Sequence, residues 1–359
     1  MYAIRRWGRV PVLLLAATAV VASLSTGCSS EDEPDNAVSA DAPLPTEIPP
    51  GTKLVIADQS ERQQGFLGAS GEREKLPFAA EFANFVGGPA ILEAFRAGAA
   101  DVALVGDTPP IQAQLAGQDV PIIAAFQADP NSIRITVGPD KNINSLADLK
   151  GHKIAFAEGT AQQVVVLRAL EKANLKPDDV ELVRLQLSEF PDAVRTGQVD
   201  AAPLSEPTLT RVLRTPGTHT ISEAEAEGTA TGLSFLYARR EALQDPAKAA
   251  ALRAYVASLI RAVQWTNEHP DEFIAKYYVG GQKLKPEEGE AIVDSLGAYA
   301  FPHLDQELVD RQQDTIDVID RAGQLPKEIE AADGFDLRFD EVITQTVTET
   351  GAGFERETS

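Results

Sequence analysis

The sequence predicts an α/β protein built from two similar lobes. Short apolar runs alternate with helical patterns from residue 53 to about residue 240, which is typical of βαβ units around parallel sheets. The pattern A-x-R-x-G-x-x-D-x-A occurs at residues 94–103 and again at residues 193–202. Each copy predicts a helix end, a glycine that terminates the helix and the next strand. Such sequences also recur in unrelated α/β proteins, and this alternative stays open.

Seven apolar runs predict buried strands, and the last third of the chain is predicted to be helical. The runs cover residues 53–57, 101–105, 121–126, 153–157, 180–185, 199–204 and 233–238. Beyond Asp245, apolar residues recur at three-to-four spacing. Residues 62–75 hold three glycines and predict a surface loop, with a mobile lid as the alternative. Four aromatic residues at helical spacing are expected to fill the core, with a place in a cleft as the alternative: Trp265, Phe273, Tyr277 and Tyr278.

Residues 1–27 have the pattern of a secretory signal peptide. Three arginines precede an apolar segment at residues 12–24 that is too short to span a bilayer. Residues 24–28, LSTGC, end in the only cysteine of the chain and resemble a bacterial lipobox. We therefore expect an exported protein that is lipid-anchored through Cys28 at the outer face of the bacterial cytoplasmic membrane, or in the periplasm. An ordinary secretory peptide is the alternative.

The composition excludes several function classes. The formal charge is −22, and it becomes −25 once the three arginines of residues 1–27 are removed. Binding to nucleic acid is not expected, because it needs clustered Lys and Arg. With Cys28 lipidated, no thiol remains for a disulfide or a cysteine nucleophile. The four histidines are far apart, so we expect neither a metal nor a cofactor.

These patterns divide the chain into six parts. We expect a signal peptide at 1–27, a disordered tether at 28–51, the first part of lobe 1 at 52–133, lobe 2 at 134–230, the second, helical part of lobe 1 at 231–340 and a C-terminal tail at 341–359. The tether prediction depends on the Ser, Glu, Asp and Pro content of that stretch, which offers little apolar surface to bury.

Helix starts and acidic residues follow several of the predicted strands. Helices are expected to begin at Gly88-Pro89, at Thr108-Pro109 and, through a capping box, at residues 160–163. Every helix needs a cap, but several N-termini together would attract an anion. Asp107 and Glu206 each stand six residues after the aspartate of a repeat copy, where open α/β sheets bind ligands.

Three segments resemble the aliphatic sulfonate, taurine and nitrate binding proteins of ABC importers. They are FVGGPAILEAF at 85–95, VGDTPP at 105–110 and SLADLKGHKIA at 145–155. The resemblance extends over about residues 53–340, and G-D-T-P-P is its most specific part. It implies a two-lobe, type II periplasmic-binding-protein fold with a ligand cleft between the lobes. It also implies a monomeric, non-enzymatic receptor that delivers a small organic anion to a permease and its ATPase.

The resemblance also implies a set of ligand contacts. They fall on Gln59, Ser60, Gly88, Asp107, Thr108, Gly159, Thr160, Ala161 and Glu206. Relatives often have two tryptophans where residues 202–207 read APLSEP, so this side of the pocket should be open and a small linear sulfonate is disfavoured. Glu206, together with Asp107, would hold an ammonium or another donor group of the ligand.

Two other function classes remain open at this point. Sulfinate desulfinases and thiamine-precursor synthases resemble these receptors, but they use a cysteine nucleophile or a cysteine-rich motif. The chain also lacks the G-x-S-x-G, Walker, H-E-x-x-H and dinucleotide-binding motifs. A carboxylate-driven enzyme for a small organosulfur substrate and an extracytoplasmic sensor are the alternatives to a receptor. The choice among sulfonate, taurine, nitrate and a sulfate ester also stays open.

Overall fold

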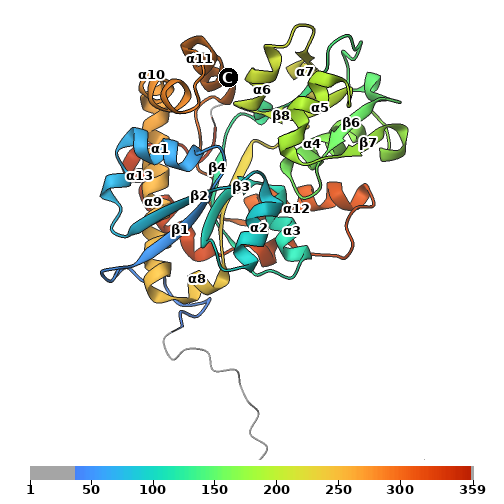
Figure 1. The fold of residues 1–359 in the computed structure, drawn as a ribbon. Helices are drawn as coiled ribbons and strands as arrows, with labels where there is room; N and C mark the ends of the chain where they lie inside the picture. Colours follow the sequence, from blue (N-terminus) through green and yellow to red (C-terminus); the bar gives the residue numbers. More distant parts are fainter. Residues whose placement is uncertain (1–36, 357–359) are drawn as a thin grey trace, which may run out of the picture. The chain divides into compact units, whose positions relative to one another are not determined.

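Two five-stranded sheets organise the chain in the computed structural model, which describes residues 37–356 (Figure 1). Sheet A has the order β2-β1-β3-β10-β4 and comprises β1 (Lys53–Asp58), β2 (Ala79–Asn84), β3 (Val102–Gly106), β4 (Ile122–Gln127) and β10 (Leu233–Ala238). Sheet B has the order β7-β6-β8-β5-β9 and comprises β5 (Ile133–Val137), β6 (Lys153–Phe156), β7 (Glu181–Arg184), β8 (Ala201–Ser205) and β9 (His219–Thr220).

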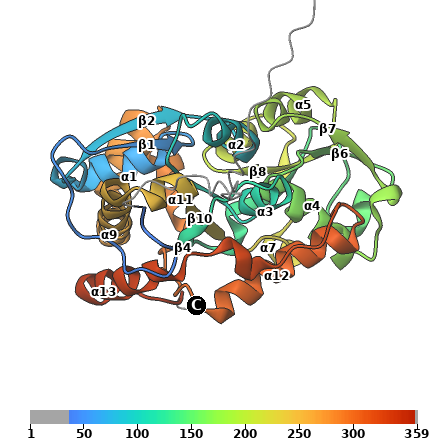
Figure 2. The same cartoon turned by 90° about the horizontal axis from the view of Figure 1, so that it is seen from below.

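The helices fall into two groups according to the sheet whose strands they neighbour in the sequence. Those next to sheet A in the sequence are α1 (Arg62–Ser70), α2 (Gly88–Arg96), α3 (Thr108–Leu115), α8 (Arg240–Gln244), α9 (Pro246–Glu268), α10 (Pro270–Phe273), the π-helical η6 (Ile274–Gly281), α11 (Pro286–Leu296), α12 (Gln306–Arg321) and α13 (Asp340–Thr350). Those next to sheet B are α4 (Ala161–Lys172), α5 (Phe190–Thr196), α6 (Thr208–Leu213) and α7 (Glu223–Ala226). Short 3-10 turns occur at Arg73–Lys75, Pro130–Ser132, Ala147–Leu149, Pro177–Asp179, Leu187–Glu189, Ala331–Gly334 and Leu337–Phe339. Helix α12 runs beside α4 and so joins the two groups (Figure 2).

The sheets are mixed, which corrects the expectation of parallel sheets. In sheet A, β1 pairs in parallel with β2 and β3, whereas β10 is antiparallel to β3 and β4. In sheet B, β6 pairs in parallel with β7 and β8, whereas β5 is antiparallel to β8. Strands β5 and β10 each follow directly after the chain has passed from one sheet to the other. They therefore enter their sheets at the end where the neighbouring strands finish.

All seven predicted apolar runs are strands, with bounds that differ by a residue or two. Three strands have no counterpart among the predictions. Strand β2 is largely exposed and contains Glu81, β5 contains Arg134 and Thr136, and β9 has two residues. Strands of this kind lack the continuous apolar run by which buried strands are found.

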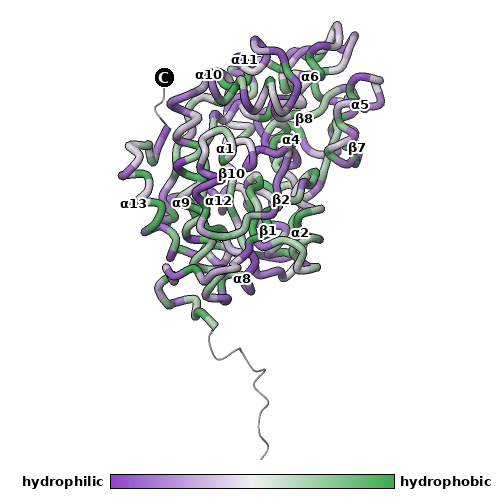
Figure 3. Tube along the Cα trace, turned by 60° about the vertical axis from the view of Figure 1, so that its left-hand side comes forward, coloured by the Kyte–Doolittle hydropathy of each residue, from purple (hydrophilic) through white to green (hydrophobic). Residues whose placement is uncertain are grey.

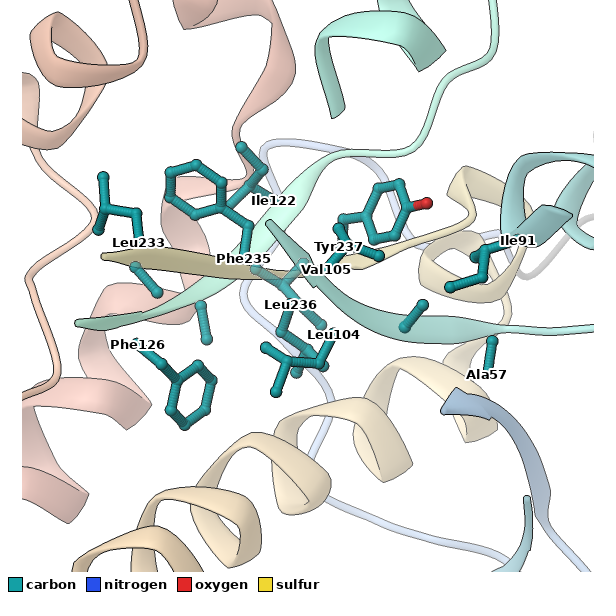
Figure 4. Packing of buried hydrophobic residues seen from close by; sticks show 14 of the residues in the cluster. Ala57, Ile91, Leu104, Val105, Ile122, Phe126, Leu233, Phe235, Leu236 and Tyr237 are labelled. Atoms are coloured by element: carbon teal, nitrogen blue, oxygen red, sulfur yellow. The ribbon is translucent and has the colours of Figure 1, made fainter. Parts of the chain in front are cut away.

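Strand β10 lies at the centre of the hydrophobic core of sheet A. Phe235 and Tyr237 lie on one face of the strand and Leu236 on the other, and all three are fully buried (Figure 4). Burial of such a side chain stabilises the fold by about 1.5–3 kcal/mol. Along the covering helices, hydrophilic and hydrophobic residues alternate (Figure 3), as expected when one face packs on a sheet and the other meets water.

The two aspartates of the internal repeat make equivalent hydrogen bonds, so the repeat has a structural role. Asp101 accepts a hydrogen bond from the Val55 N–H at 2.9 Å, and Asp200 accepts one from the Lys153 N–H at 2.9 Å. Each carboxylate thus fixes the neighbouring parallel strand, β1 or β6. Asp101 is also paired with Arg239 and Lys248.

Residues 62–70 form helix α1, so the prediction of a surface loop is wrong for this stretch. Its glycines lower helix propensity, but Phe66 and Leu67 are buried. Gly65 is required by packing, because a Cβ there would lie 2.3 Å from Cδ2 of Tyr277. Burial of one face of α1 outweighs the weak helix propensity.

Residues 37–51 and 341–356 are more ordered than the sequence predicts. Within 37–51, the Val38 N–H donates to the Gln244 carbonyl at 2.8 Å, and Leu44 and Ile48 pack against the core. The disordered tether is therefore wrong for these residues, because two apolar side chains and a backbone hydrogen bond anchor them. Similarly, most of the expected tail at 341–359 is helix α13, which buries residues such as Ile343.

The signal peptide, Cys28 and residues 28–36 of the tether lie outside the described residues, as do residues 357–359. Among residues 37–356, no helix is long and apolar enough to cross a bilayer.

We expect Asp200→Asn to lower the free energy of unfolding by about 2 kcal/mol at pH 7. Burial raises the pKa of this carboxyl, but hydrogen bonds from Lys141, the Lys153 N–H and His152 outweigh it and hold the pKa at about 2, below the ordinary 3.8. This stabilisation is complete above about pH 4 and is lost as the pH falls toward about 2, because the unfolded state then binds more protons.

Urea unfolding of both proteins between pH 7 and pH 3 measures this effect. The exposed Asp192→Asn is the control and should change stability by less than about 0.5 kcal/mol. An Asp200→Asn effect that does not shrink with falling pH would contradict the assignment.

Candidate functional site

A cavity of about 800 Å³ lies between sheet A and sheet B. Residues that follow the C-terminal ends of β1, β3 and β8 line it, among them Gln59, Asp107 and Glu206. Its volume is within the range of about 300–1,000 Å³ that is usual for small-molecule sites. The cavity is therefore the candidate ligand site.

Three helices from the two sheets begin at this cavity. Helices α2 and α3 follow strands of sheet A, and α4 follows a strand of sheet B. A Cβ at Gly88 would lie 2.4 Å from Cγ of Pro109 and 3.3 Å from the Gly159 carbonyl oxygen. A Cβ at Gly106 would lie 2.7 Å from Cβ of Ala161. The three N-termini consequently meet with no room for larger residues at positions 88 and 106.

No side chain caps the N-termini of α2, α3 or α4. The predicted capping box at residues 160–163 is wrong, because Thr160 Oγ1 donates to the Ala157 carbonyl at 2.7 Å. Gln163 Oε1 accepts from the Gly159 N–H at 2.8 Å. The N-cap residues thus leave the positive ends of the three helix dipoles without a side-chain cap, and the neutral Gln59 and Gln163 oxygens accept from the Gly87 and Gly159 N–H groups, which precede the first helical residues.

Gln59 and Ser60 connect the end of β1 to the cavity. Gln59 Oε1 accepts from the Gly87 N–H at 3.1 Å and so positions the start of α2. The Ser60 carbonyl accepts from the Tyr277 hydroxyl at 2.7 Å and from Gln282 at 2.8 Å. The loop that holds Gln59 and Ser60 is thus fixed to α2 on one side and to η6 on the other.

Asp107 is held by hydroxyl groups of the protein. Its carboxylate accepts from Thr108 Oγ1 at 3.0 Å and from Thr231 Oγ1 at 2.7 Å. Its carbonyl accepts from Gln312 Nε2 at 2.7 Å. Thr108 is fully buried, and its hydroxyl serves Asp107 instead of capping α3.

The Glu206 carboxylate lines the cavity from sheet B, and Glu61 lines it from the side of sheet A. Glu206 Oε2 accepts from the Thr210 N–H at 3.1 Å, and within residues 37–356 no Lys, Arg or His side chain lies within ion-pair distance of Glu206. Burial raises the pKa of the Glu206 carboxyl, although the Thr210 hydrogen bonds and the charges of Arg134 and Arg211 oppose this shift.

The structure brings most of the predicted site residues together. The members that line the cavity are Gln59, Ser60, Gly88, Asp107, Thr160, Ala161 and Glu206. Thr108 and Gly159 do not line it. Gly159 lies behind the residues that line the cavity. Its φ of +74° favours glycine, and a Cβ there would lie 3.0 Å from Cγ of Gln112.

The sequence patterns missed one feature of the cavity and gave another only as an alternative. Arg62 lines it, and in the described part of the chain this guanidinium has no carboxylate within 4.0 Å; its nearest polar contact is Ser234 Oγ at 3.5 Å. Phe273, Tyr277 and Tyr278 were expected in the core, yet they line the cavity as well. Arg62 belongs to α1, which the sequence patterns did not predict, whereas the aromatic residues belong to the part of the chain predicted to be helical.

Metal binding has no support in the described structure. Among residues 37–356, no group of three or more His, Cys, Asp or Glu side chains is placed to hold a metal ion. The fourth predicted aromatic, Trp265, lies away from the cavity and stacks on His269 with ring centroids 4.9 Å apart.

A sequence profile described as NMT1/THI5 like matches residues 87–273, which include the starts of α2, α3 and α4. The chain belongs to the NMT1/THI5-like family. A protein of Escherichia coli (strain K12) that carries the name aliphatic sulfonates-binding protein is 35% identical over 156 residues, 44% of this chain. That match spans about half of the relative, 49%. A protein of the same name from Bacillus subtilis (strain 168) is 26% identical over 281 residues, 77% of this chain and 82% of the relative.

Solved structures of family relatives establish the fold. The alkanesulfonate-binding protein SsuA from Xanthomonas axonopodis pv. citri, bound to MOPS, matches with a TM-score of 0.72 and 24% identity over 80% of this chain and 99% of its own. The periplasmic aliphatic sulphonate binding protein SsuA from Escherichia coli matches with a TM-score of 0.68 and 26% identity over 81% and 100%. The periplasmic-binding-protein fold is confirmed. The desulfurization enzyme DszB shares this fold at 15% identity and a TM-score of 0.59 over 83% of this chain and 99% of its own.

We expect Glu206→Gln to stabilise the ligand-free protein at neutral pH. Because burial raises the folded-state pKa of this carboxyl, ionisation destabilises the folded state above that pKa, and the penalty disappears as the pH falls. Glutamine keeps an oxygen that can accept from the Thr210 N–H. Thermal unfolding should therefore show a higher Tm for Glu206→Gln at pH 8 and equal Tm values near pH 4. A lower Tm at pH 8 would contradict the assignment.

Proposed function

We propose that this protein is the solute-binding receptor of an ABC importer and that it captures a small organic anion, most simply a sulfonate. The observation that carries the proposal is the meeting of three uncapped helix N-termini, from both sheets, at one cavity. Backbone N–H groups at helix starts bind oxyanions well, because the donors are fixed in place and the helix dipole favours negative charge.

The chemistry of the cavity fits an anion that is ionised throughout the physiological pH range. Arg62 supplies a positive charge that no carboxylate of the described residues neutralises. Three sulfonate oxygens can accept from several N–H groups and from the guanidinium together, and such charge-assisted hydrogen bonds are the strong ones. The sulfonate-binding relatives support the same ligand class.

We further propose that the two sheets are two lobes that close on the ligand. The proposed lobes are residues 52–133 with 231–340, and residues 134–230. Sheet membership supports this division, because the chain changes sheets between Gln127 and Ile133 and again between Thr220 and Leu233. Closure would place the starts of α2 and α3 on one side of the anion and the start of α4 on the other.

Glu206 would restrict which organic anions bind. A free carboxylate in the cavity would repel a plain anion, so we propose that it accepts from an ammonium, hydroxyl or amide of the ligand. Asp107 already accepts hydrogen bonds from two hydroxyl groups, so we propose that it positions the residues around it and does not contact the ligand directly. Taurine, nitrate and sulfate esters are ligands to be compared with sulfonates.

We also propose an exported protein that is tethered by lipid at Cys28 and works as a monomer with a membrane permease and its ATPase. The periplasmic relatives support export. The lipobox-like residues 24–28 support the tether. The proposed activity is binding without catalysis. The cysteine nucleophile expected of a desulfinase has no counterpart among residues 37–356, which contain no cysteine.

Titration calorimetry with sulfonates, taurine, nitrate and sulfate esters tests the proposed ligand class. We expect at least one sulfonate to bind and Arg62→Gln to weaken it by about tenfold to a hundredfold, the usual effect of removing a charged hydrogen-bond partner. Arg73→Gln removes the same charge from α1's neighbouring turn outside the cavity and should leave affinity unchanged. Failure of every small anion to bind would refute the proposal.

Cell fractionation tests the tether. We expect the wild-type chain in the membrane fraction, resistant to a high-salt wash, and Cys28→Ser in the soluble exported fraction, since one acyl-modified residue supplies the anchor. Equal distribution of the two proteins would contradict lipidation at Cys28. Binding of sulfonates by the soluble variant serves as the control for folding.

A further inference from the structure

One side of the cavity is built from aromatic side chains. This aromatic wall consists of Phe66 from α1, Phe273 from α10, Tyr277 and Tyr278 from η6, and Tyr299 after α11. The members contact one another as ring pairs. Phe66 stacks on Phe273 with centroids 5.4 Å apart and meets Tyr299 edge-on at 5.8 Å.

The remaining contacts keep the wall rigid. Phe273 stacks on Tyr277 at 5.1 Å, and Tyr277 meets Tyr278 edge-on at 4.9 Å. The Tyr277 hydroxyl donates to the Ser60 carbonyl at 2.7 Å, and Gly65 leaves the space in which the Tyr277 ring lies. A ligand would therefore meet preformed ring surfaces and would not have to order them.

The loop at residues 59–60 connects the aromatic wall to the start of α2, one of the three helix starts proposed to bind the anion. Gln59 bonds to the Gly87 N–H at the start of α2, and the next residue, Ser60, bonds to Tyr277 of the wall. Arg62, two residues further along, has its guanidinium in the same cavity. A ligand that places its anionic group at the helix starts would thus have its body beside the rings.

Two hydroxyls of the wall are available to a ligand. Within residues 37–356, neither the Tyr278 nor the Tyr299 hydroxyl bonds to another protein group, and neither is sealed inside the protein. Burial raises the pKa of Tyr278 well above its ordinary value, so its hydroxyl keeps its proton and can donate. Glu206 reaches the same end of the cavity from sheet B.

The volume of the cavity leaves room for a ring beside the anionic group. About 800 Å³ is the size of a site that encloses a molecule with one or two rings. A short alkyl chain would leave most of the wall uncovered. A flat ring can add stacked and edge-on contacts to the existing ring pairs, and these contribute beyond the area that they bury.

We infer that the ligand class is arylsulfonates, with the sulfonate at the starts of α2, α3 and α4 and the ring against the aromatic wall. This inference rests on the proposed function and narrows its ligand class. It assigns Phe66, Tyr278 and Tyr299 as specificity-determining residues. Polar ring substituents would meet the Tyr278 and Tyr299 hydroxyls and Glu206.

Titration calorimetry on the purified exported chain with three probes tests the inference: methanesulfonate, hexane-1-sulfonate and benzenesulfonate. The last two have the same number of carbon atoms and differ in ring character. We expect benzenesulfonate to bind at least tenfold more tightly than hexane-1-sulfonate. Equal affinity, or tighter binding of hexane-1-sulfonate, overturns the inference and leaves the proposed function standing. Absence of binding by all three overturns the inference, and it refutes the proposed function as well only if taurine, nitrate and sulfate esters also fail to bind.

Two variants separate ring recognition from a structural effect. Tyr299→Leu and Phe66→Leu should each weaken benzenesulfonate binding at least threefold more than methanesulfonate binding. Tyr299 is only partly buried, so its variant keeps the test valid if Phe66→Leu fails to fold. Trp265→Leu, an aromatic replacement outside the cavity, should preserve the preference. An equal loss of methanesulfonate and benzenesulfonate binding would show that the wall only supports the fold.

Discussion

The side chain of Gln127 ties together the two places where the chain passes between the sheets. Its Nε2 donates to the Ala128 carbonyl at 2.9 Å in the first crossing and to the Thr231 carbonyl at 2.7 Å in the second. Gly232 lets the two crossings approach each other closely, because a Cβ at this position would lie 2.4 Å from the Ala128 carbonyl oxygen. The crossings are thus held side by side, next to the antiparallel pair of β4 and β10, and the strand ends of both sheets face one cavity.

From this arrangement follows a division of tasks within the site. The starts of α2, α3 and α4, where we propose that the anionic group binds, come from both groups of helices. Side chains of α1 and η6, from one group of helices, line one part of the cavity, and residues around β8 such as Glu206 line another. The group of helices around sheet A can therefore change its preference for the body of a ligand while the helix starts continue to hold the same anionic group.

The sequence predicted what local patterns and residue types determine. Buried strands such as β3 and β8 are continuous apolar runs, so their ends, and with them Asp107 and Glu206, could be placed. Helix α1 could not be, because its glycines argue against a helix and its stability depends on α9 and η6, which are distant in the sequence. Arg62 was missed for the same reason. The roles of Thr108 and Thr160 also escaped prediction, because their hydroxyls bond to groups whose direction only the tertiary structure sets.

The contact between Gly88 and Pro109 has an evolutionary consequence. Each position limits the other, because any side chain at 88 would occupy the volume in which the Pro109 ring lies. A change at either site is therefore acceptable only with a compensating change at its partner, and the two positions should vary together among descendants of this sequence. The distance between the starts of α2 and α3 should therefore be conserved even when the residues at these two positions change.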